Sequence, residues 1–218
     1  MYKLKTFLIA SLACALLAGI PVPGYTKDKD EGSPRIKTAD GDVMLELVGQ
    51  VMNPSPTTSN QYGYLSSLNG VDGIFNPGPQ NETTARFTFF TEAVTTRVIN
   101  NGALRIVNRT GVTTIYRHDT PGDFTNPNSF RDGTPVLTAT LRQQVILDTV
   151  EGTFTATNVN TVTSAATFAV GDDEFRLGKV GDQFRTSING RRDLTVPPAG
   201  FVIAGYAVAI GKAKPESE

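Results

Sequence analysis

The sequence predicts an all-β protein: a single antiparallel β-barrel of about eight to ten strands, with a β-sandwich as the alternative. Thr, Val, Phe and Ile dominate the middle of the chain, where Gly, Asn, Asp and Pro interrupt them at short intervals. Outside the N-terminal segment, no stretch repeats apolar residues at the helical period of 3.6. Two expected strands are about fourteen residues long, roughly 45 Å if straight, and strands of that length coil well into a closed barrel.

The expected strands are short apolar or alternating runs bounded by turn residues. In the first of them, Leu45 and Leu47 share one face while Glu46 and Gln50 share the other. In chain order the strands are expected at 43–51, 61–68, 85–98, 103–108, 112–118, 136–150, 152–164 and 201–211, with shorter ones at 174–180 and 183–188.

Turn chemistry predicts how some of these strands pair. Asn-Gly at 101–102 tolerates positive φ in a tight turn, so the strands on either side of it are expected to form an antiparallel hairpin. A second hairpin is expected around Glu151-Gly152. The segment 201–211 is apolar on both faces, which indicates a buried strand.

The N-terminus has the layout of a secretory signal peptide. Lys3 and Lys5 precede an uncharged apolar run, and the chain turns polar directly after it. The run is shorter than the ~18 residues that span a membrane, so cleavage near Gly24 is expected and a retained anchor is the alternative. This predicts a secreted or periplasmic protein with no membrane span after cleavage.

The expected organisation is a signal peptide at 1–24, a flexible charged segment at 25–42, the barrel at 43–211 and a polar tail at 212–218. Cys14, the single cysteine, leaves with the signal peptide, which excludes zinc–thiolate sites and cysteine nucleophiles from the mature chain. The formal net charge of −1 gives no electrostatic reason to expect nucleic acid as a partner. No cofactor is expected, and the oligomeric state is left open.

The strand order, with "VGQV" early and "GTFTATNVNTVTS" late behind a signal peptide, resembles the β-barrel group of allene oxide cyclases and dirigent-type proteins. The resemblance implies the barrel fold. It carries over no catalytic residue, since the chain holds no motif of either family's activity.

His118 is the only histidine, so a Ser-His-Asp triad would need it, and the chain has no G-x-S-x-G elbow. We therefore interpret His118 as an exposed residue at the start of the long loop 119–135. That loop is the expected rim or lid of a cavity. Its side-chain oxygens favour turn formation over a calcium site, although metal binding by the loop is left open. They belong to Asp119, Asp123, Asn126, Asn128 and Asp132.

The stretch 85–94, "ARFTFFTEAV", places Phe87 and Phe89 on one strand face, which is expected to point to the core. The opposite face carries three of the four candidate ligand-binding residues, and the fourth lies on the strand 136–150. These candidates are Arg86, Phe90, Glu92 and Arg142. If their faces line the lumen, they orient a ligand there; if the lumen is filled, they are solvated outside.

Three functions follow from these alternatives. The first is a barrel that binds a small apolar molecule in its lumen. The second is a structural or interaction protein of the envelope or extracellular space, with a filled core. The third is a cyclase-like or isomerase-like enzyme in which the cavity shapes a reactive substrate.

Overall fold

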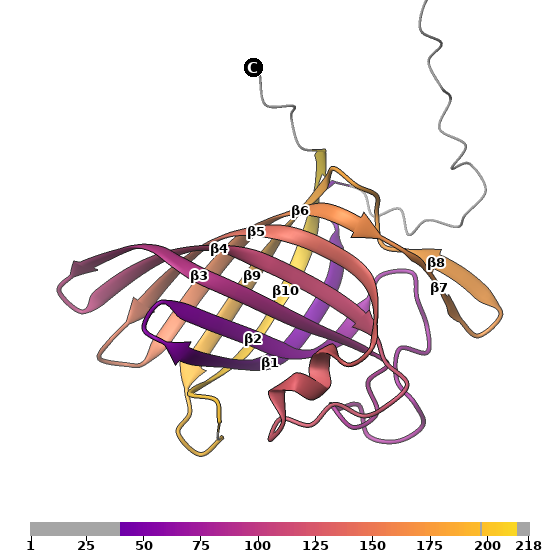
Figure 1. The fold of residues 1–218 in the computed structure, drawn as a ribbon, viewed down its shortest axis with the longest axis horizontal. Helices are drawn as coiled ribbons and strands as arrows, with labels where there is room; N and C mark the ends of the chain where they lie inside the picture. The colour runs from indigo at the N-terminus through magenta and orange to yellow at the C-terminus, as the bar shows by residue number, and fades with distance from the viewer. Residues whose placement is uncertain (1–39, 197, 213–218) are drawn as a thin grey trace, which may run out of the picture. The chain divides into compact units, whose positions relative to one another are not determined.

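The computed structural model describes residues 40–196 and 198–212 of the 218-residue chain. The expected signal peptide and nearly all of both terminal segments therefore lie outside the described residues. The described part holds ten strands and one 3-10 helix (Figure 1). Their bounds are β1 Val43–Ser55, β2 Thr58–Leu68, β3 Phe87–Asn101, β4 Leu104–Arg117, η1 Pro127–Arg131, β5 Thr134–Asp148, β6 Thr153–Ala165, β7 Thr167–Val170, β8 Asp173–Arg176, β9 Asp182–Arg192 and β10 Phe201–Lys212.

Eight of the strands form a closed barrel in the order β1-β10-β9-β6-β5-β4-β3-β2. Neighbouring strands are antiparallel, and β1 pairs with β10 to close the ring. The prediction of a single antiparallel barrel is confirmed, and closure of the ring excludes the sandwich. The other two strands, β7 and β8, pair with each other in a hairpin between β6 and β9.

Both predicted hairpins are present. β3 and β4 pair up to Asn101 opposite Leu104, and Gly102 between them has a φ of 60°, as a tight Asn-Gly turn requires. β5 and β6 pair across the turn at Gly152, where φ is 68°.

The two strands expected at 103–108 and 112–118 are one continuous strand, β4. Gly111 does not break it, because this glycine lies in the sheet opposite Ala93, where a Cβ would collide with the carbonyl oxygen of Glu92. The prediction for 201–211 also needs correction. In β10, Ile203 and Ala207 are buried, whereas Tyr206 on the other face is 45% exposed.

The barrel interior is filled by alternate side chains, as the period of two in a strand requires. Phe87 and Phe89 face inward, as expected, and belong to the main hydrophobic core. Gly49 and Gly63 lie opposite each other on β1 and β2, and a Cβ at either would lie 3.0 Å from the Phe89 ring. The two glycines thus make room for this ring inside the barrel.

A second, smaller core lies on the outer wall of β2 and β3. Tyr62 and Phe90 face outward, and the segment between β4 and β5 folds over them and buries Phe130 completely. The Phe130 ring lies 5.5 Å from that of Tyr62, and the Thr88 hydroxyl donates a 2.8 Å hydrogen bond to the Phe130 carbonyl. Figure 1 shows η1 outside the strands of the barrel.

Candidate functional site

The structure brings two of the four predicted ligand-binding residues together, and it places them outside the barrel. Phe90 is buried beneath the η1 segment, and Glu92 forms a 3.2 Å ion pair with Arg131 of that segment. The Arg131 guanidinium carbon also lies 4.8 Å from the centre of the Phe90 ring. Phe90 and Glu92 therefore hold a loop against the wall and do not line the lumen.

The other two predicted residues lie apart from this pair. Arg86 directly precedes β3, and its Nη1 donates a 3.2 Å hydrogen bond to the carbonyl oxygen of Gly73, which ties down the loop after β2. Arg142 is exposed on the outer face of β5, opposite Thr110. Neither arginine faces into the barrel.

The long loop 119–135 differs from its expected role as a rim, since its central part packs against the barrel wall. His118 differs too: it is 2% exposed, because the loop folds over it. Its Nδ1 lies 2.9 Å from the Thr120 carbonyl oxygen, which indicates that Nδ1 carries the proton, and the buried Nε2 has no hydrogen-bond partner. Arg117 and Asp119 beside it form a 3.1 Å ion pair at the surface.

The lumen is nearly filled at its centre, where a cavity of about 20 Å³ remains between the side chains. A row of polar side chains crosses this level. The hydroxyls of Thr91 and Thr113 are 2.8 Å apart, and Asn160 Nδ2 donates a 3.1 Å bond to Thr186 Oγ1. This central space is about that of a single water molecule, so it does not accommodate a small organic ligand.

The end of the barrel nearest the β5–β6 turn holds a different arrangement, which we call the Arg109 mouth. It is the cavity of about 70 Å³ that Arg109 and three amides line together with apolar side chains from five strands; the amides are Asn53, Gln61 and Gln143. Those apolar side chains are Val51, Val107, Val145, Leu147, Phe154 and Phe201.

Arg109 reaches into this mouth from β4 and has only amide partners. Its Nη1 donates a 3.2 Å hydrogen bond to Gln143 Oε1, and its Nη2 lies 3.5 Å from Asn53 Oδ1. Its Nε is buried with no hydrogen-bond partner. Within residues 40–196 and 198–212, no carboxylate pairs with it.

The electrostatics of the mouth are positive. Burial lowers the pKa of the Arg109 guanidinium, and the nearby Arg105 lowers it further. An arginine stays charged at neutral pH despite such a shift. The Arg109 mouth therefore presents an uncompensated positive charge among apolar walls, an arrangement that suits an anion with an apolar part.

Two aromatic rings form the wall of the mouth away from Arg109. Phe154 and Phe201 meet edge to face, with ring centroids 5.5 Å apart. The Phe154 ring also covers Gly190 on β9, where a Cβ would collide with it. Gly190 thus lets the ring lie flat against the sheet.

Sequence reasoning missed Arg109 because it ended a strand at Asn108. The signal was present: Arg105, Val107 and Arg109 alternate at period two, and the alternation continues through Gly111 to Thr113. Extending the strand across Gly111 would have put Arg109 on the same face as Val107.

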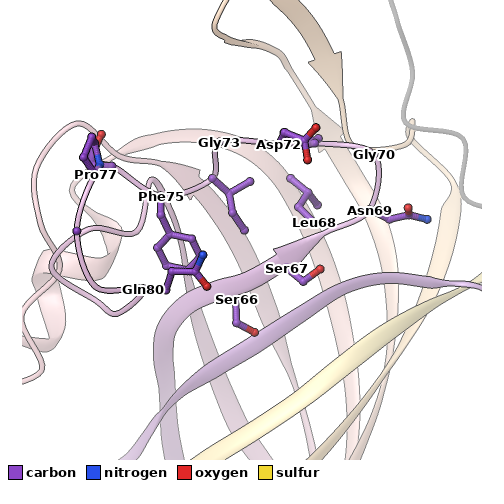
Figure 2. A pocket seen from close by; sticks show the side chains of 14 residues that line it. Ser66, Ser67, Leu68, Asn69, Gly70, Asp72, Gly73, Phe75, Pro77 and Gln80 are labelled. Atoms are coloured by element: carbon purple, nitrogen blue, oxygen red, sulfur yellow. The ribbon is translucent and has the colours of Figure 1, made fainter.

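A second hollow, of about 670 Å³, lies between the end of β2 and the loop that follows it (Figure 2). Figure 2 shows Ser66 and Ser67 on the strand side and Asp72, Phe75 and Gln80 on the loop side. The hollow is open to solvent, and Asp72 is the single ionisable group that lines it. With no group of charges converging on it, it is a weaker site than the Arg109 mouth.

The described residues hold neither a metal-binding cluster nor a membrane-spanning helix. No three His, Cys, Asp or Glu side chains among them lie close enough to hold a metal ion. None of their helices has the length and hydrophobicity to cross a membrane.

No protein-family model, curated protein or solved structure matches the chain. The resemblance to allene oxide cyclases and dirigent-type proteins therefore stays a prediction. The candidate site is therefore identified from the geometry of the barrel alone.

Proposed function

We propose that this chain is a secreted or periplasmic β-barrel protein that binds a small, largely apolar molecule at the Arg109 mouth. The observation that carries the proposal is the unpaired Arg109, which faces into the barrel beside an apolar cavity. Arg109 is only partly buried, so its guanidinium is open to an incoming ligand, and no carboxylate of the described residues has to be displaced from it.

The site has more room than its inner cavity of about 70 Å³. The hairpin of β3 and β4 is long, and its pairing places Val98 opposite Val107, which lies opposite Val145. These three valines continue the apolar wall of the mouth across neighbouring strands. A ligand that approaches Arg109 therefore passes along an apolar surface.

The proposal is tested by native mass spectrometry of the protein purified from its own host, followed by a thermal-shift screen with neutral and anionic lipophilic compounds. We expect a co-purified small molecule, or a rise in Tm with at least one compound class. A folded protein that carries no small molecule and shows no shift with any compound would refute the proposal.

The chain offers a matched pair of variants for this test. Leu147 lines the mouth, whereas Ile146, its neighbour on β5, is 42% exposed on the outer wall. We expect Leu147→Ser to weaken binding of any compound found in the screen at least several-fold, and Ile146→Ser to leave it unchanged. Equal effects of the two substitutions would place the binding site elsewhere.

A structural or interaction protein with a filled core is the second candidate function. The filled centre of the lumen favours it, since a cavity of about 20 Å³ makes the barrel a solid scaffold. Absence of ligand binding in the experiments above would favour this candidate.

A further inference from the structure

We infer that the ligand of the Arg109 mouth is a short-chain monocarboxylate, whose carboxylate binds Arg109 and whose alkyl part lies against Phe154 and Phe201. The inference rests on the proposed function and names the chemistry of its ligand. It follows from three features of the mouth: the free donors of Arg109, the row of amides that fixes it, and the size and polarity of the walls.

The first feature is the hydrogen-bonding capacity of the guanidinium. An arginine has five N–H donors. The bonds to Gln143 and Asn53 use two of them, and both acceptors are neutral amide oxygens. A carboxylate would supply the missing negative charge and accept two parallel hydrogen bonds, the pairing that the planar guanidinium favours.

The second feature is the row of side chains that orients Arg109. Gln143 accepts the bond from Arg109 through its Oε1 and donates a 3.0 Å bond from its Nε2 to Asn158 Oδ1. Gln143 and Asn158 are buried and lie opposite each other on β5 and β6. The row fixes the guanidinium before any ligand arrives, which reduces the entropy lost on binding.

The third feature is the size and polarity of the cavity. The cavity of about 70 Å³ is larger than the central one of about 20 Å³, and it suits a carboxylate with a short alkyl chain. Apart from Arg109 and the three amides, the walls are aromatic and aliphatic. Such walls disfavour phosphate or sulfate, whose oxygens need hydrogen-bond partners on every side.

The charges around the site support an anion. Arg105 lies four residues before Arg109 on the same strand face and adds a second positive charge near the mouth. Two acidic side chains of the described residues, Glu92 and Asp119, form ion pairs with Arg131 and Arg117, and none of the described acidic side chains pairs with Arg105 or Arg109. A ligand anion is thus drawn inward.

The test is a titration of the folded protein, followed by ¹H–¹⁵N NMR spectra. The probes are sodium acetate, propionate and butyrate, with propionamide and 1-propanol as uncharged analogues, and phosphate and chloride as anions without an alkyl part. We expect saturable shifts at residues of β4, β5 and β10 around the mouth with the carboxylates. Propionate should bind at least ten-fold more tightly than propionamide or phosphate.

Two substitutions of arginine provide the matched comparison. Arg109→Gln keeps much of the side-chain length and removes the charge, and we expect it to weaken propionate binding at least ten-fold. Arg142→Gln makes the same change on the outer face of β5 and should leave binding unchanged. If Arg109→Gln does not fold, Arg109→Lys keeps the charge without the planar fork, and binding at least three-fold weaker is expected.

Each other outcome overturns the inference in a distinguishable way. Saturable binding of propanol or propionamide at the mouth as tight as that of propionate would leave the proposed function standing and refute the carboxylate. Equal binding of phosphate would show a site for anions in general. Unchanged propionate binding in the Arg109 variant would refute the role of Arg109. No binding by any apolar or carboxylate probe, in this titration and in the screen, would refute both.

Discussion

Tyr62 lies on the outer wall of the barrel and has no exposed surface. Its ring packs between those of Phe90 and Phe130, with centroids 6.1 Å and 5.5 Å away. Its hydroxyl has one distant partner, Gln50 Oε1 at 3.4 Å. Burial raises the pKa of the Tyr62 phenol from 10.0 to about 12. The folded protein therefore disfavours the phenolate that the unfolded chain forms freely.

This shift predicts a loss of stability in alkali. The neutral Tyr62 phenol contributes fully to the free energy of unfolding below pH 10. This contribution is lost as the pH rises through about 12, because between these two values Tyr62 ionises in the unfolded chain and stays neutral in the folded protein. We expect the free energy of unfolding to fall with pH over this range, and to fall less steeply in Tyr62→Phe. Urea unfolding at a series of pH values measures both slopes.

The control for this prediction is Tyr206→Phe, because the Tyr206 side chain is 45% exposed. Some slope should remain in the Tyr62 variant, since burial also raises the pKa of Tyr64. Identical slopes in the wild-type protein and in Tyr62→Phe would contradict the account.

Among the individual residues, the sequence could predict those whose role depends on strand alternation alone. Phe87 and Phe89 were expected to face the core, and they do. The burial of Phe90 could not be predicted. Alternation with a period of two assigns each residue to one face of a strand, but it does not show which segment of the chain covers that face. The segment that covers Phe90 lies about forty residues further along the chain, and no local pattern reports such a contact.

At the scale of elements, the segment between β4 and β5 is held to the wall by one anchor. Phe130 is fully buried, and its ring fills the space beside Gly122, where a Cβ would lie 2.7 Å from it. The Thr88 hydroxyl adds a buried hydrogen bond to the Phe130 carbonyl, whereas the ion pair of Arg131 with Glu92 is exposed. Exposed ion pairs contribute about 0–1 kcal/mol, so the anchor dominates.

We therefore expect Phe130→Ala to destabilise the protein by about 3–5 kcal/mol and to open the segment 119–135 to proteases. Arg131→Ala should cost less than about 1 kcal/mol and leave the segment protected. Urea unfolding measures the stability, and limited proteolysis with mass spectrometry locates the cuts. Similar behaviour of the two variants would show that the segment is not held by Phe130.

The hairpins were predictable because a tight turn depends on residues that are adjacent in the sequence, as at Asn101-Gly102 and Gly152. The strand bounds around Gly111 were predicted wrongly, although the alternation of side chains continues across this glycine. A glycine between two apolar runs is a turn signal in most sequences, and only its close approach to Ala93 and the Glu92 carbonyl explains why it lies in a strand here. Because Gly111 was interpreted as a turn, Arg109 was left outside the expected strands, and the candidate site was not predicted.

At the scale of the whole molecule, the proposed location makes a prediction about the mature chain. If the first 24 residues are a signal peptide, the protein isolated from its host should begin near Tyr25. Intact mass measurement and N-terminal sequencing test this. Leu12→Arg places a charge in the apolar run and should block processing, while Cys14→Ser should leave it unchanged. A secreted or membrane-bound chain that retains Met1 would contradict cleavage.

The long hairpin of β3 and β4 has a consequence for how copies of this protein meet. The pairing of β2 with β3 ends at Thr58 and Val94, but β3 continues to Asn101 with β4 on its other side. The backbone of β3 beyond Thr95 is thus a free sheet margin, although a ring of strands should have none. This margin carries the exposed Val98 and Ile99 and one charged residue, Arg97, and a charge at a free sheet edge opposes pairing with another chain. Replacing Arg97 with Val or Ile would leave an apolar edge at which copies of the chain could pair strand to strand.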